Sequence, residues 1–521
     1  MLIEKIYKHR KLIFLSSPII IFACYLTFLF APFYFDDFYN IVHNPDLNSL
    51  SDALRCRLGG FRPFAYLWFY FDKKFFGLNP FYFRLENVIL HLLNFILVFN
   101  VLKYLTREFG KEKAFVLSFF ASLFWALNPI NSQSVAYIVQ RMNEAATMFI
   151  LIGFLFYLKA IEERKVLFVF PGIVALVVAM GFKETGVLLI PLCLLHYTIF
   201  KDFKKGILGF LFFIMLGFSA VFFLPQFDKV LPIAYLLGAP VNDKAFTIVE
   251  KFLTSFKVIL DYLIVFLLPL YRNIHLYYGF ILEKSVFSIG FLIPFIIVFS
   301  LFLTGIRFFK KNRFVSFLIL SPLLLLFPEN SFLPLDIAYQ HRMYLPSVFL
   351  SLLVVFSIFH LIEKEELLYG VFGFLFVFLI LNLVVRGVVF SFPEKFYANE
   401  LLHAPNNEKI YINAAKNLIE KGNLEEAYYY LEKGLRKFPD NPLLAMNMGL
   451  FWAKTGELDK AIYWYKKAEK RGNPFIKEVF WSLAVLYLEK KDFKKVKEYL
   501  FLLEKNGFDF EKINWLKKKL K

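Results

Sequence analysis

The sequence predicts a mostly α-helical membrane protein: a polytopic bundle of about eleven transmembrane helices followed by a smaller helical repeat domain. Its 521 residues are 59% hydrophobic and 20% aromatic. Their mean hydropathy is +0.57, which is typical of chains that cross a membrane several times. Apolar segments recur as far as residue 391, and near residue 400 the composition changes to Lys, Glu, Tyr and Ala. We therefore place the membrane domain at residues 1–395 and the repeat domain at residues 400–521.

Eleven apolar segments are candidates for crossing a bilayer, which takes roughly 17 to 25 residues, or fewer where neighbouring helices bury the segment. They lie at 12–33, 84–102, 114–128, 145–160, 166–181, 185–200, 206–224, 286–306, 315–328, 344–362 and 367–391. The first is too long for a signal-peptide core and has no small-residue cleavage motif, so we predict an uncleaved helix. A twelfth candidate, 250–271, carries four charged residues in its first half. Those charges favour an interfacial or re-entrant helix.

Basic residues predict the orientation of the bundle. The formal net charge is +18, but Lys and Arg gather in short connections and in the C-terminal region, which indicates membrane anchoring rather than nucleic-acid binding. The basic connections are 4–11, 103–113, 161–165, 201–205 and 307–313. Eleven crossings place all five in the cytoplasm, whereas twelve would move the last one outside. We therefore expect loops 34–83, 128–144 and 329–343, and the repeat domain, to be extracytoplasmic.

The C-terminal region contains an internal repeat. In 418-LIEKGNLEEAYYYLEKGL-435 and 452-WAKTGELDKAIYWYKKAE-469, Gly422, Leu424 and Ala427 recur as Gly456, Leu458 and Ala461. A third, poorer copy at 486–503 is offset by one residue. This is the spacing of tetratricopeptide repeats, in which small Ala residues let paired helices approach and Gly turns the chain. We predict a short α-solenoid that binds a protein partner or packs on the membrane domain.

Two adjacent carboxylates, Asp36 and Asp37, lie in 32-PFYFDDFYNIVHNP-45, directly after the first predicted span. Their loop, 34–83, is far longer than the roughly 12 to 15 residues of most loops without secondary structure, which favours a function for it. Aromatic neighbours and the adjoining like charge can raise the pKa of one carboxyl toward that of a useful base. The alternative interpretation is a solvated helix end.

Further charged residues are expected on the same side of the membrane. They are Arg141 and Glu144 in loop 128–144 and its helix, Lys183 and Glu184 in a short turn, and His341, Arg342 and Tyr344 at the start of the tenth span. Basic groups converging on an acidic pair suit an anionic phosphate beside a catalytic carboxylate. Two alternatives stay open: Arg141 and Glu144, three residues apart, pair with each other, or these side chains are interfacial anchors.

The sequence gives little indication of metal, thiol or nucleotide chemistry. Cys24, Cys56 and Cys193 are scattered and show no CxxC or Cys/His spacing, so neither a zinc site nor a disulfide framework is predicted. The paired aspartates are ligands that a divalent cation prefers, but no third ligand is evident, so we predict no required cofactor. No glycine-rich nucleotide loop is apparent.

Five segments, in order, carry a family resemblance: FDDFYNIVHNPDL, RPFAYLWFYFDKKFFGLNPFYFRLENVILHLLN, LNPINSQSVAYIVQRMNEAATMF, KETGVLLIP and YQHRMYLPS. Followed by the repeats, they resemble the transmembrane and tetratricopeptide repeat-containing O-mannosyltransferases and their bacterial relatives, which belong to the GT-C class of membrane glycosyltransferases. The chain departs from that pattern at Asn128, where relatives usually have His, at Gln140, where they usually have Gly, and in its shorter repeat array. These departures bear on substrate identity rather than on fold.

The resemblance implies a multi-pass enzyme of the bacterial inner membrane that transfers a sugar from a polyprenyl-phosphate carrier to a protein or glycan hydroxyl outside the cytoplasm. In GT-C enzymes an acidic residue of the first external loop is the base, which maps onto Asp36 or Asp37. We predict inverting transfer, with the donor phosphate bound by Arg141, Lys183, His341 and Arg342 and with Glu144, Glu184 and Tyr344 in support. Two other classes remain: a tetratricopeptide scaffold anchored in the membrane, and a lipid or polysaccharide transporter.

Overall fold

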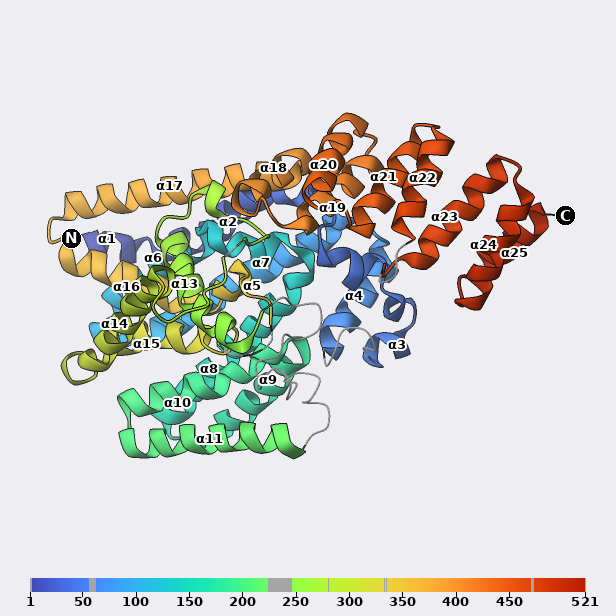
Figure 1. Cartoon of the computed structure of the whole chain (residues 1–521). Helices are drawn as coiled ribbons and strands as arrows, with labels where there is room; N and C mark the ends of the chain where they lie inside the picture. The colour runs from blue at the N-terminus through green and yellow to red at the C-terminus, as the bar shows by residue number, and fades with distance from the viewer. Residues whose placement is uncertain are drawn as a thin grey trace. The chain divides into compact units, whose positions relative to one another are not determined.

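The computed structural model (Figure 1) describes residues 2–55, 62–223, 246–279, 281–331, 333, 335–469 and 473–520. Helices, short helical turns and loops make up these residues, with no β-strand among them. The predicted mostly α-helical fold is therefore confirmed. The chain forms two compact units, Met1–Ser391 and Phe392–Lys521. One of the three cysteines, Cys56, lies outside the described residues.

Helices occupy all of the segments predicted as spans, as far as the structure describes them. After the short α1 (Leu2–Lys8), they are α2 (Arg10–Tyr25) with its extension η1 (Leu26–Phe30), α5 (Pro80–Leu105), α6 (Lys111–Leu127), α8 (Arg141–Glu163), α9 (Val169–Phe182), α10 (Leu189–Phe200), α11 (Phe203–Phe223), α14 (Ile289–Lys311), α15 (Arg313–Leu326), α16 (Pro346–Leu361) and α17 (Glu365–Ser391). Many apolar side chains on them point outward; Ile289 is 73% exposed and Phe374 75%. Such surfaces suit lipid rather than water.

Length and apolarity separate these helices into two groups. Among the described residues, 5 helices are long and apolar enough to cross a membrane: Arg10–Phe30, Pro80–Leu105, Ile138–Glu163, Ile289–Lys311 and Glu365–Ser391. A sixth span is formed if α6 and the segment Pro129–Ala136, bent by 53°, count together, and α9, α10, α15 and α16 are shorter apolar helices. The chain is thus an integral, multi-pass membrane protein. The number of eleven crossings and the orientation stay predictions.

Helix α13 (Ile248–Leu267) forms where the sequence predicts an interfacial or re-entrant helix. A capping box starts it: the Thr247 side chain accepts from the Glu250 backbone while the Glu250 carboxylate accepts from the Thr247 backbone, which satisfies two N–H groups that the helix leaves unpaired. Lys251 is fully buried and donates to the backbone carbonyls of Leu333 and Leu335. The helix therefore holds loop 329–343 in place.

The chain between α6 and α8 does not continue as one helix. It turns at Asn128, whose side chain accepts from Ile130 N, and then forms η5 (Pro129–Asn131), α7 (Ser132–Ala136) and η6 (Ile138–Gln140). Polar side chains of α5 satisfy its carbonyls: Arg84 donates to Ala136 O at 2.8 Å and Asn87 to Val135 O at 3.1 Å. Irregular backbone is tolerated in a membrane domain only where protein pairs it in this way.

Loop 34–83 contains helices of its own, which accounts for its length. They are η2 (Phe38–Val42), η3 (Pro45–Asn48), α3 (Leu50–Arg55) and α4 (Pro63–Phe76). Helix α4 begins at Pro63 and ends at Phe76, and it is followed by Gly77, whose φ of 63° suits glycine. It packs on α9, where a Cβ on Gly181 would lie 2.3 Å from the Phe64 ring. A side chain at position 181 would therefore have to displace the Phe64 ring.

The C-terminal unit is a series of short helices: α18 (Pro393–His403), α19 (Glu408–Glu420), α20 (Leu424–Lys437), α21 (Pro442–Lys454), α22 (Leu458–Ala468), α23 (Ile476–Glu489), α24 (Phe493–Lys505) and α25 (Phe510–Lys519). Helices α19 and α20, α21 and α22, and α23 and α24 pack in pairs. The repeated Ala427 and Ala461 are fully buried. Assignment of these pairs to the tetratricopeptide class stays a prediction.

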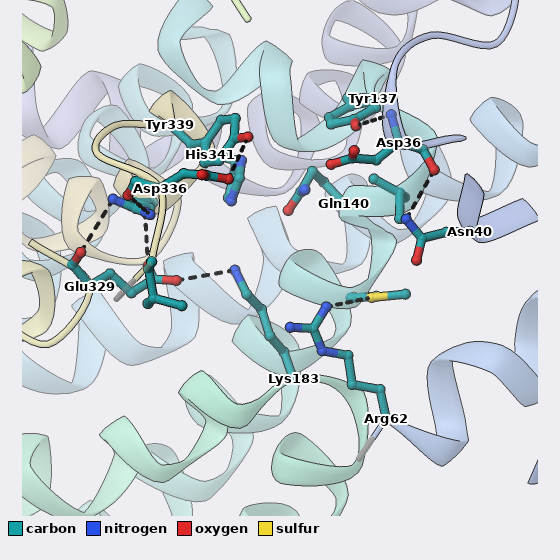
Figure 2. A pocket seen from close by; sticks show the side chains of 14 residues that line it. Asp36, Asn40, Arg62, Tyr137, Gln140, Lys183, Glu329, Asp336, Tyr339 and His341 are labelled. Atoms are coloured by element: carbon teal, nitrogen blue, oxygen red, sulfur yellow. Dashed lines mark hydrogen bonds and ion pairs between the residues drawn. The ribbon is translucent and has the colours of Figure 1, made fainter. Parts of the chain in front are cut away.

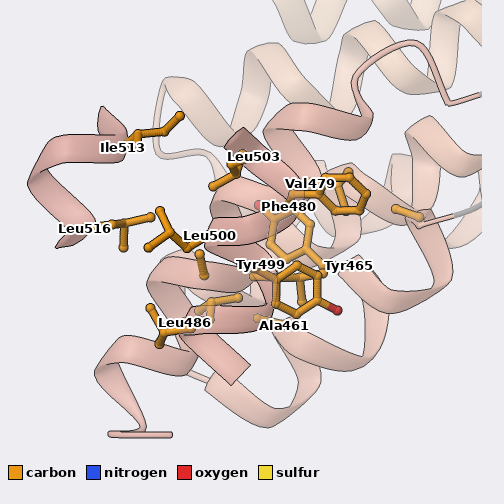
Figure 3. Packing of buried hydrophobic residues seen from close by; sticks show 14 of the residues in the cluster. Ala461, Tyr465, Val479, Phe480, Leu486, Tyr499, Leu500, Leu503, Ile513 and Leu516 are labelled. Carbon is orange, nitrogen blue, oxygen red and sulfur yellow. The ribbon is translucent and has the colours of Figure 1, made fainter. Parts of the chain in front are cut away.

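Apolar side chains join the last two pairs into one core. Tyr465 from α22 packs with Phe480 of α23 and with Tyr499 of α24, and Leu516 of α25 completes the cluster (Figure 3). The turn inside each pair uses a residue with positive φ: Gly422 at 79° and Gly456 at 83°. In the third pair Lys491 takes that position with φ 59°, which a residue with a side chain adopts at a cost.

Candidate functional site

A polar cavity of about 200 Å³ lies in the membrane unit, among the first loop, the α6–α8 connection, the α9–α10 turn and loop 329–343 (Figure 2). Its lining consists of Asp36, Asn40, Arg62, Tyr137, Val139, Gln140, Met142, Lys183, Glu329, Leu335, Asp336, Tyr339, His341 and Arg342. Four of the residues predicted from the sequence are therefore brought together: Asp36, Lys183, His341 and Arg342.

Asp36 is held at the cavity through its backbone. Its N–H donates to the Tyr137 hydroxyl at 2.7 Å, and its carbonyl accepts from the Asn40 side chain at 2.9 Å. The preceding Phe35 has a φ of 45°, a strained conformation for a residue with a side chain, and such strain gathers at functional sites. The two adjacent aspartates nevertheless lie in different surroundings, because Asp36 lines the cavity and Asp37 does not.

Asp37 lies in the protein interior and does not line the cavity. It is fully buried, and its two carboxylate oxygens accept from the backbone N–H groups of Tyr34 at 3.1 Å and Val139 at 2.9 Å. Burial raises the pKa of the Asp37 carboxyl to about 7, and the positive charge of Arg84 opposes that rise. The side chain thus joins the first loop to the α6–α8 connection.

Basic groups converge on one carboxylate, Glu329. The Lys183 Nζ lies 3.6 Å from Glu329 Oε1, and the Arg342 Nε lies 3.8 Å from Glu329 Oε2. Burial would raise the pKa of Glu329, but Lys183 and Arg342 outweigh it and hold that pKa below its ordinary value. Burial lowers the pKa of Lys183, and Glu329 counters part of that shift.

A third ion pair lies beside these two. Arg62 of the first loop contacts Glu184 of the α9–α10 turn, with Arg62 Nη2 at 2.8 Å from Glu184 Oε2. Arg62 lines the cavity and Glu184 does not. The Glu184 side chain is 57% exposed, so solvent screens it far more than it screens Glu329. Glu184 therefore holds Arg62 at the rim of the cavity.

His341 and Arg342 each have one buried nitrogen without a hydrogen-bond partner in the described part of the chain. His341 is 6% exposed, and its Nδ1 has no hydrogen-bond partner within the described part of the chain. Burial, with Lys183 and Arg342 nearby, holds the pKa of His341 well below its usual value, so the ring is neutral. Arg342 uses its Nη atoms on the carbonyls of Asp336 and Ile337, and its Nε makes no hydrogen bond to any described residue.

Arg141 does not line the cavity. It is 1% exposed and forms ion pairs with Asp72 of α4 and, at 3.1 Å, with Glu86 of α5. Its Nε donates to Asn87 Oδ1 at 2.8 Å, and its guanidinium carbon lies 5.1 Å from the Trp68 ring centre. Arg141 therefore ties α8 to α4 and α5, and the alternative of a pair with Glu144 is wrong.

Glu144 and Tyr344 lie deeper in the bundle. The Tyr344 hydroxyl donates to Glu144 Oε1 at 3.1 Å and lies 2.8 Å from His91 Nδ1. Asn94 donates to both the Glu144 carbonyl and the Tyr344 hydroxyl. All four side chains are fully buried. Tyr344 follows Arg342 by two residues, so this cluster anchors the segment that carries His341 and Arg342.

Sequence reasoning missed several cavity residues, above all Arg62 and Glu329. Arg62 is the first residue of the family-like segment RPFAYLWFYFDKKFFGLNPFYFRLENVILHLLN, but a lone arginine in a long loop gives no local signal. Glu329 follows the ninth predicted span in 328-PEN-330, and a charge so near an apolar segment is a functional candidate by the argument that selected Lys183. Among the described residues, no three His, Cys, Asp or Glu gather as metal ligands do.

An apolar groove of about 350 Å³ lies among α10, α13, α14 and α15. Its lining is almost entirely hydrocarbon: Leu195, Phe252, Ser255, Phe256, Ile259, Val298, Phe299, Phe302, Leu320, Leu323, Leu324, Phe327 and Asn330. Asn330 is adjacent in sequence to Glu329 of the polar cavity, and its Oδ1 accepts from Arg342 Nη1 at 3.3 Å. A residue that lines the groove is thus hydrogen-bonded to a residue that lines the polar cavity.

Comparison with known proteins confirms the resemblance to O-mannosyltransferases. The chain is 29% identical to human "Protein O-mannosyl-transferase TMTC1" over 199 residues, which is 33% of this chain and 22% of that protein. It is 24% identical to "Protein O-mannosyl-transferase F38B6.6" of Caenorhabditis elegans over 447 residues, 80% of this chain and 61% of that protein. It is 32% identical to human "Protein O-mannosyl-transferase TMTC2" over 156 residues, 27% of this chain and 18% of that protein.

These matches span only part of each relative, about a fifth of the human proteins and 61% of the nematode protein. No protein-family profile matches the chain. No solved structure matches it either.

Proposed function

We propose that this protein is an inverting membrane glycosyltransferase that moves a sugar from a polyprenyl-phosphate donor to a hydroxyl of a protein or glycan outside the cytoplasm. The observation that carries this proposal is the cavity that Asp36 shares with Lys183, His341 and Arg342. It puts a carboxylate able to accept a proton and basic groups able to hold a phosphate within one small volume. The names of the relatives point to mannose and to a protein acceptor, which are the first substrates to test.

The proposed step needs one base and one anion site. Asp36 takes the proton of the acceptor hydroxyl, whose oxygen attacks the anomeric carbon while the bond from that carbon to the phosphate oxygen breaks. Negative charge grows on the departing lipid phosphate. Lys183 and Arg342 stabilise that charge because they are fixed in place before the reaction, in surroundings from which water is largely excluded.

Asp37 is the weaker candidate for the base. Both of its oxygens already accept backbone N–H groups, and it is fully buried. A carboxylate in such a position stabilises the loop rather than reaching a substrate hydroxyl. The sequence alone left these two aspartates equal, and we assign the base to Asp36 because it lines the cavity.

The apolar groove fits the lipid part of such a donor. A polyprenyl chain is hydrocarbon, and the groove lined by Phe256, Phe299 and Leu324 offers it surroundings as apolar as bilayer lipid. Asn330 joins the groove to Arg342 of the cavity. A donor whose chain lies in the groove would therefore bring its phosphate to the basic groups.

The test is sugar transfer by the purified full-length protein in liposomes, with radiolabelled polyprenyl-phosphate mannose and a mixture of envelope proteins as acceptor. We expect Asp36→Asn to lower kcat by about 100-fold or more, the usual contribution of a general base. Asp52→Asn, in the same loop but outside the cavity, is the matched control and should keep full activity.

Three outcomes would change this proposal. If Asp36→Asn transfers sugar at the wild-type rate while Asp37→Asn folds normally and loses activity, the base is Asp37. If both variants are fully active, neither aspartate is the base. If the wild-type protein transfers no sugar from any polyprenyl-linked donor, the transferase proposal fails and a scaffold or a transporter is favoured.

A further inference from the structure

Glu329 is a carboxylate in the place where the proposed function needs a phosphate. It lies between the Lys183 Nζ, at 3.6 Å, and the Arg342 Nε, at 3.8 Å. Both distances exceed those of direct hydrogen bonds between charged groups. Glu329 thus neutralises the two cations without occupying their strongest hydrogen-bonding positions, and the Arg342 Nε makes no hydrogen bond to any residue that the structure describes.

The charges of this end of the cavity nearly cancel. Three cations, Arg62, Lys183 and Arg342, face two carboxylates, Glu184 and Glu329, and these groups influence one another's pKa. His341 is neutral. These five charged groups together carry one net positive charge, which suits a ligand with a single negative charge. The other acidic residues of the lining, Asp36 and Asp336, add to the cost of a more highly charged ligand.

We propose that Glu329 is a specificity-determining residue that sets the charge of the phosphate the cavity accepts. It admits a phosphodiester, with one negative charge, and disfavours phosphates with two or more, namely a lipid diphosphate and the phosphate monoester that the transfer leaves behind. This inference rests on the proposed function, which already takes a lipid monophosphate sugar as the donor, and adds to it the residue that discriminates against lipid diphosphates.

The proposed reaction changes the charge that Glu329 meets. In the donor the phosphate bridges lipid and sugar and carries one negative charge. When the bond from the anomeric carbon to oxygen breaks, that oxygen keeps the electron pair, the acceptor proton goes to Asp36, and a lipid phosphate monoester departs. Phosphate monoesters lose their second proton near pH 6, so at neutral pH this product is mostly a dianion. Repulsion by Glu329 then favours its release.

Binding of phosphates that carry no sugar tests this directly on the full-length protein in detergent. The probes are three short prenyl compounds: a methyl phosphodiester, the monophosphate and the diphosphate, titrated at pH 8. We expect the wild-type protein to bind the phosphodiester most tightly. We expect Glu329→Gln to bind the monophosphate and the diphosphate about tenfold tighter or more, and to change phosphodiester affinity by less than about threefold, because one like charge is removed near the ligand.

Two further variants separate charge from shape. Glu329→Asp keeps the charge and should retain the wild-type preference. Glu184→Gln removes a charge that is more exposed to solvent, so its effect on diphosphate affinity should be smaller than that of Glu329→Gln. In turnover assays, Glu329→Gln should be more strongly inhibited by added prenyl monophosphate than the wild-type protein.

The proposal is overturned if the wild-type protein binds the diphosphate more tightly than the phosphodiester. This comparison uses the wild-type protein alone, so it does not depend on whether a variant folds. It is also overturned if a folded Glu329→Gln protein binds all three probes more weakly than the wild-type protein and by the same factor. Glu329 would then only hold Lys183 and Arg342 in position. Since the probes need no turnover, the preference is measurable even if no transfer is found. Conversely, if the wild-type protein transfers sugar and Glu329→Gln has the same preference among the three probes as the wild-type protein, the proposed function stands and only the role of Glu329 is wrong.

Discussion

Replacing Arg141 by glutamine should lower the stability of the membrane unit without removing a contact to the donor. Arg141 is 1% exposed and lies between the carboxylates of Asp72 and Glu86. Asp72 is 2% exposed, so the substitution leaves a buried carboxylate without its cation. Removing one partner of a buried ion pair typically costs about 3–5 kcal/mol. We expect Arg141→Gln to lower the free energy of unfolding by about that amount at pH 8.5.

The cost should depend on pH in a defined direction. Burial raises the pKa of Asp72 to about 7, and Glu86 adds to the rise while Arg141 opposes it. Without Arg141 that pKa rises further. Well below pH 7 the Asp72 carboxyl is protonated in both proteins, so the difference shrinks to lost hydrogen bonds of about 1–2 kcal/mol. Above pH 7 only the wild-type carboxyl ionises, and each pH unit adds up to about 1.4 kcal/mol to the difference.

Unfolding of the full-length protein in detergent, followed by tryptophan fluorescence at pH 6 and pH 8.5, measures this. Arg107→Gln is the matched control, because the pair Arg107 and Glu162 is partly exposed and should contribute less than about 1 kcal/mol. Asp72→Asn combined with Arg141→Gln should cost less than the sum of the two single changes. The reasoning is refuted if Arg141→Gln unfolds like the wild-type protein at pH 8.5 while its affinity for prenyl phosphate falls about tenfold.

Two more predictions concern the groove and the repeats. Leu324→Trp fills the apolar groove and should raise the KM for long-chain donors at least about fivefold, while the KM for short-chain donors stays unchanged. The control, Phe374→Trp on an outward face, should change neither KM. Equal KM values of Leu324→Trp for both chain lengths would contradict the assignment of the groove to the lipid chain. Lys491→Gly removes the cost of a left-handed residue, about 1–2 kcal/mol, against about 0.5–1 kcal/mol of added chain entropy. Hydrogen exchange of the backbone amides in α23 and α24 should therefore slow about two- to fivefold in Lys491→Gly. In Gly456→Ala, exchange in α21 and α22 should become faster. Unchanged exchange rates in both variants would show that the positive φ at these turns does not affect stability.

The elements of the fold could be predicted well from the sequence because each signal is local. Apolar runs mark helices such as α5 and α17 wherever they occur, and both are long enough to span a bilayer. The charged residues that distinguish α13 from the apolar spans are also visible in its own sequence. The one-residue offset of the third repeat is also visible in the sequence, and it places Lys491 where the first two copies have Gly422 and Gly456.

The candidate site could be predicted only in part. Lys183, His341 and Arg342 stood out as charges beside apolar segments, and they do line the cavity. Arg141 stood out by the same argument, but its side chain instead forms ion pairs with residues of α4 and α5. A charge near a membrane segment signals that a partner must exist. It does not say whether that partner is a substrate or another side chain, because the partner lies far away in sequence.

The sequence by itself determined the class of protein, the helical segments and the acidic pair of the first loop, because hydrophobicity and repeat period are properties of neighbouring residues. Only the tertiary structure decided between Asp36 and Asp37, since the backbone N–H groups of Tyr34 and Val139 bind the Asp37 carboxylate in the interior, whereas Asp36 lines the cavity. The role inferred for Glu329 likewise depends on its ion pairs with Lys183 and Arg342, which come from other parts of the chain. Electrostatic interactions depend on distance in space, and that distance is set by folding.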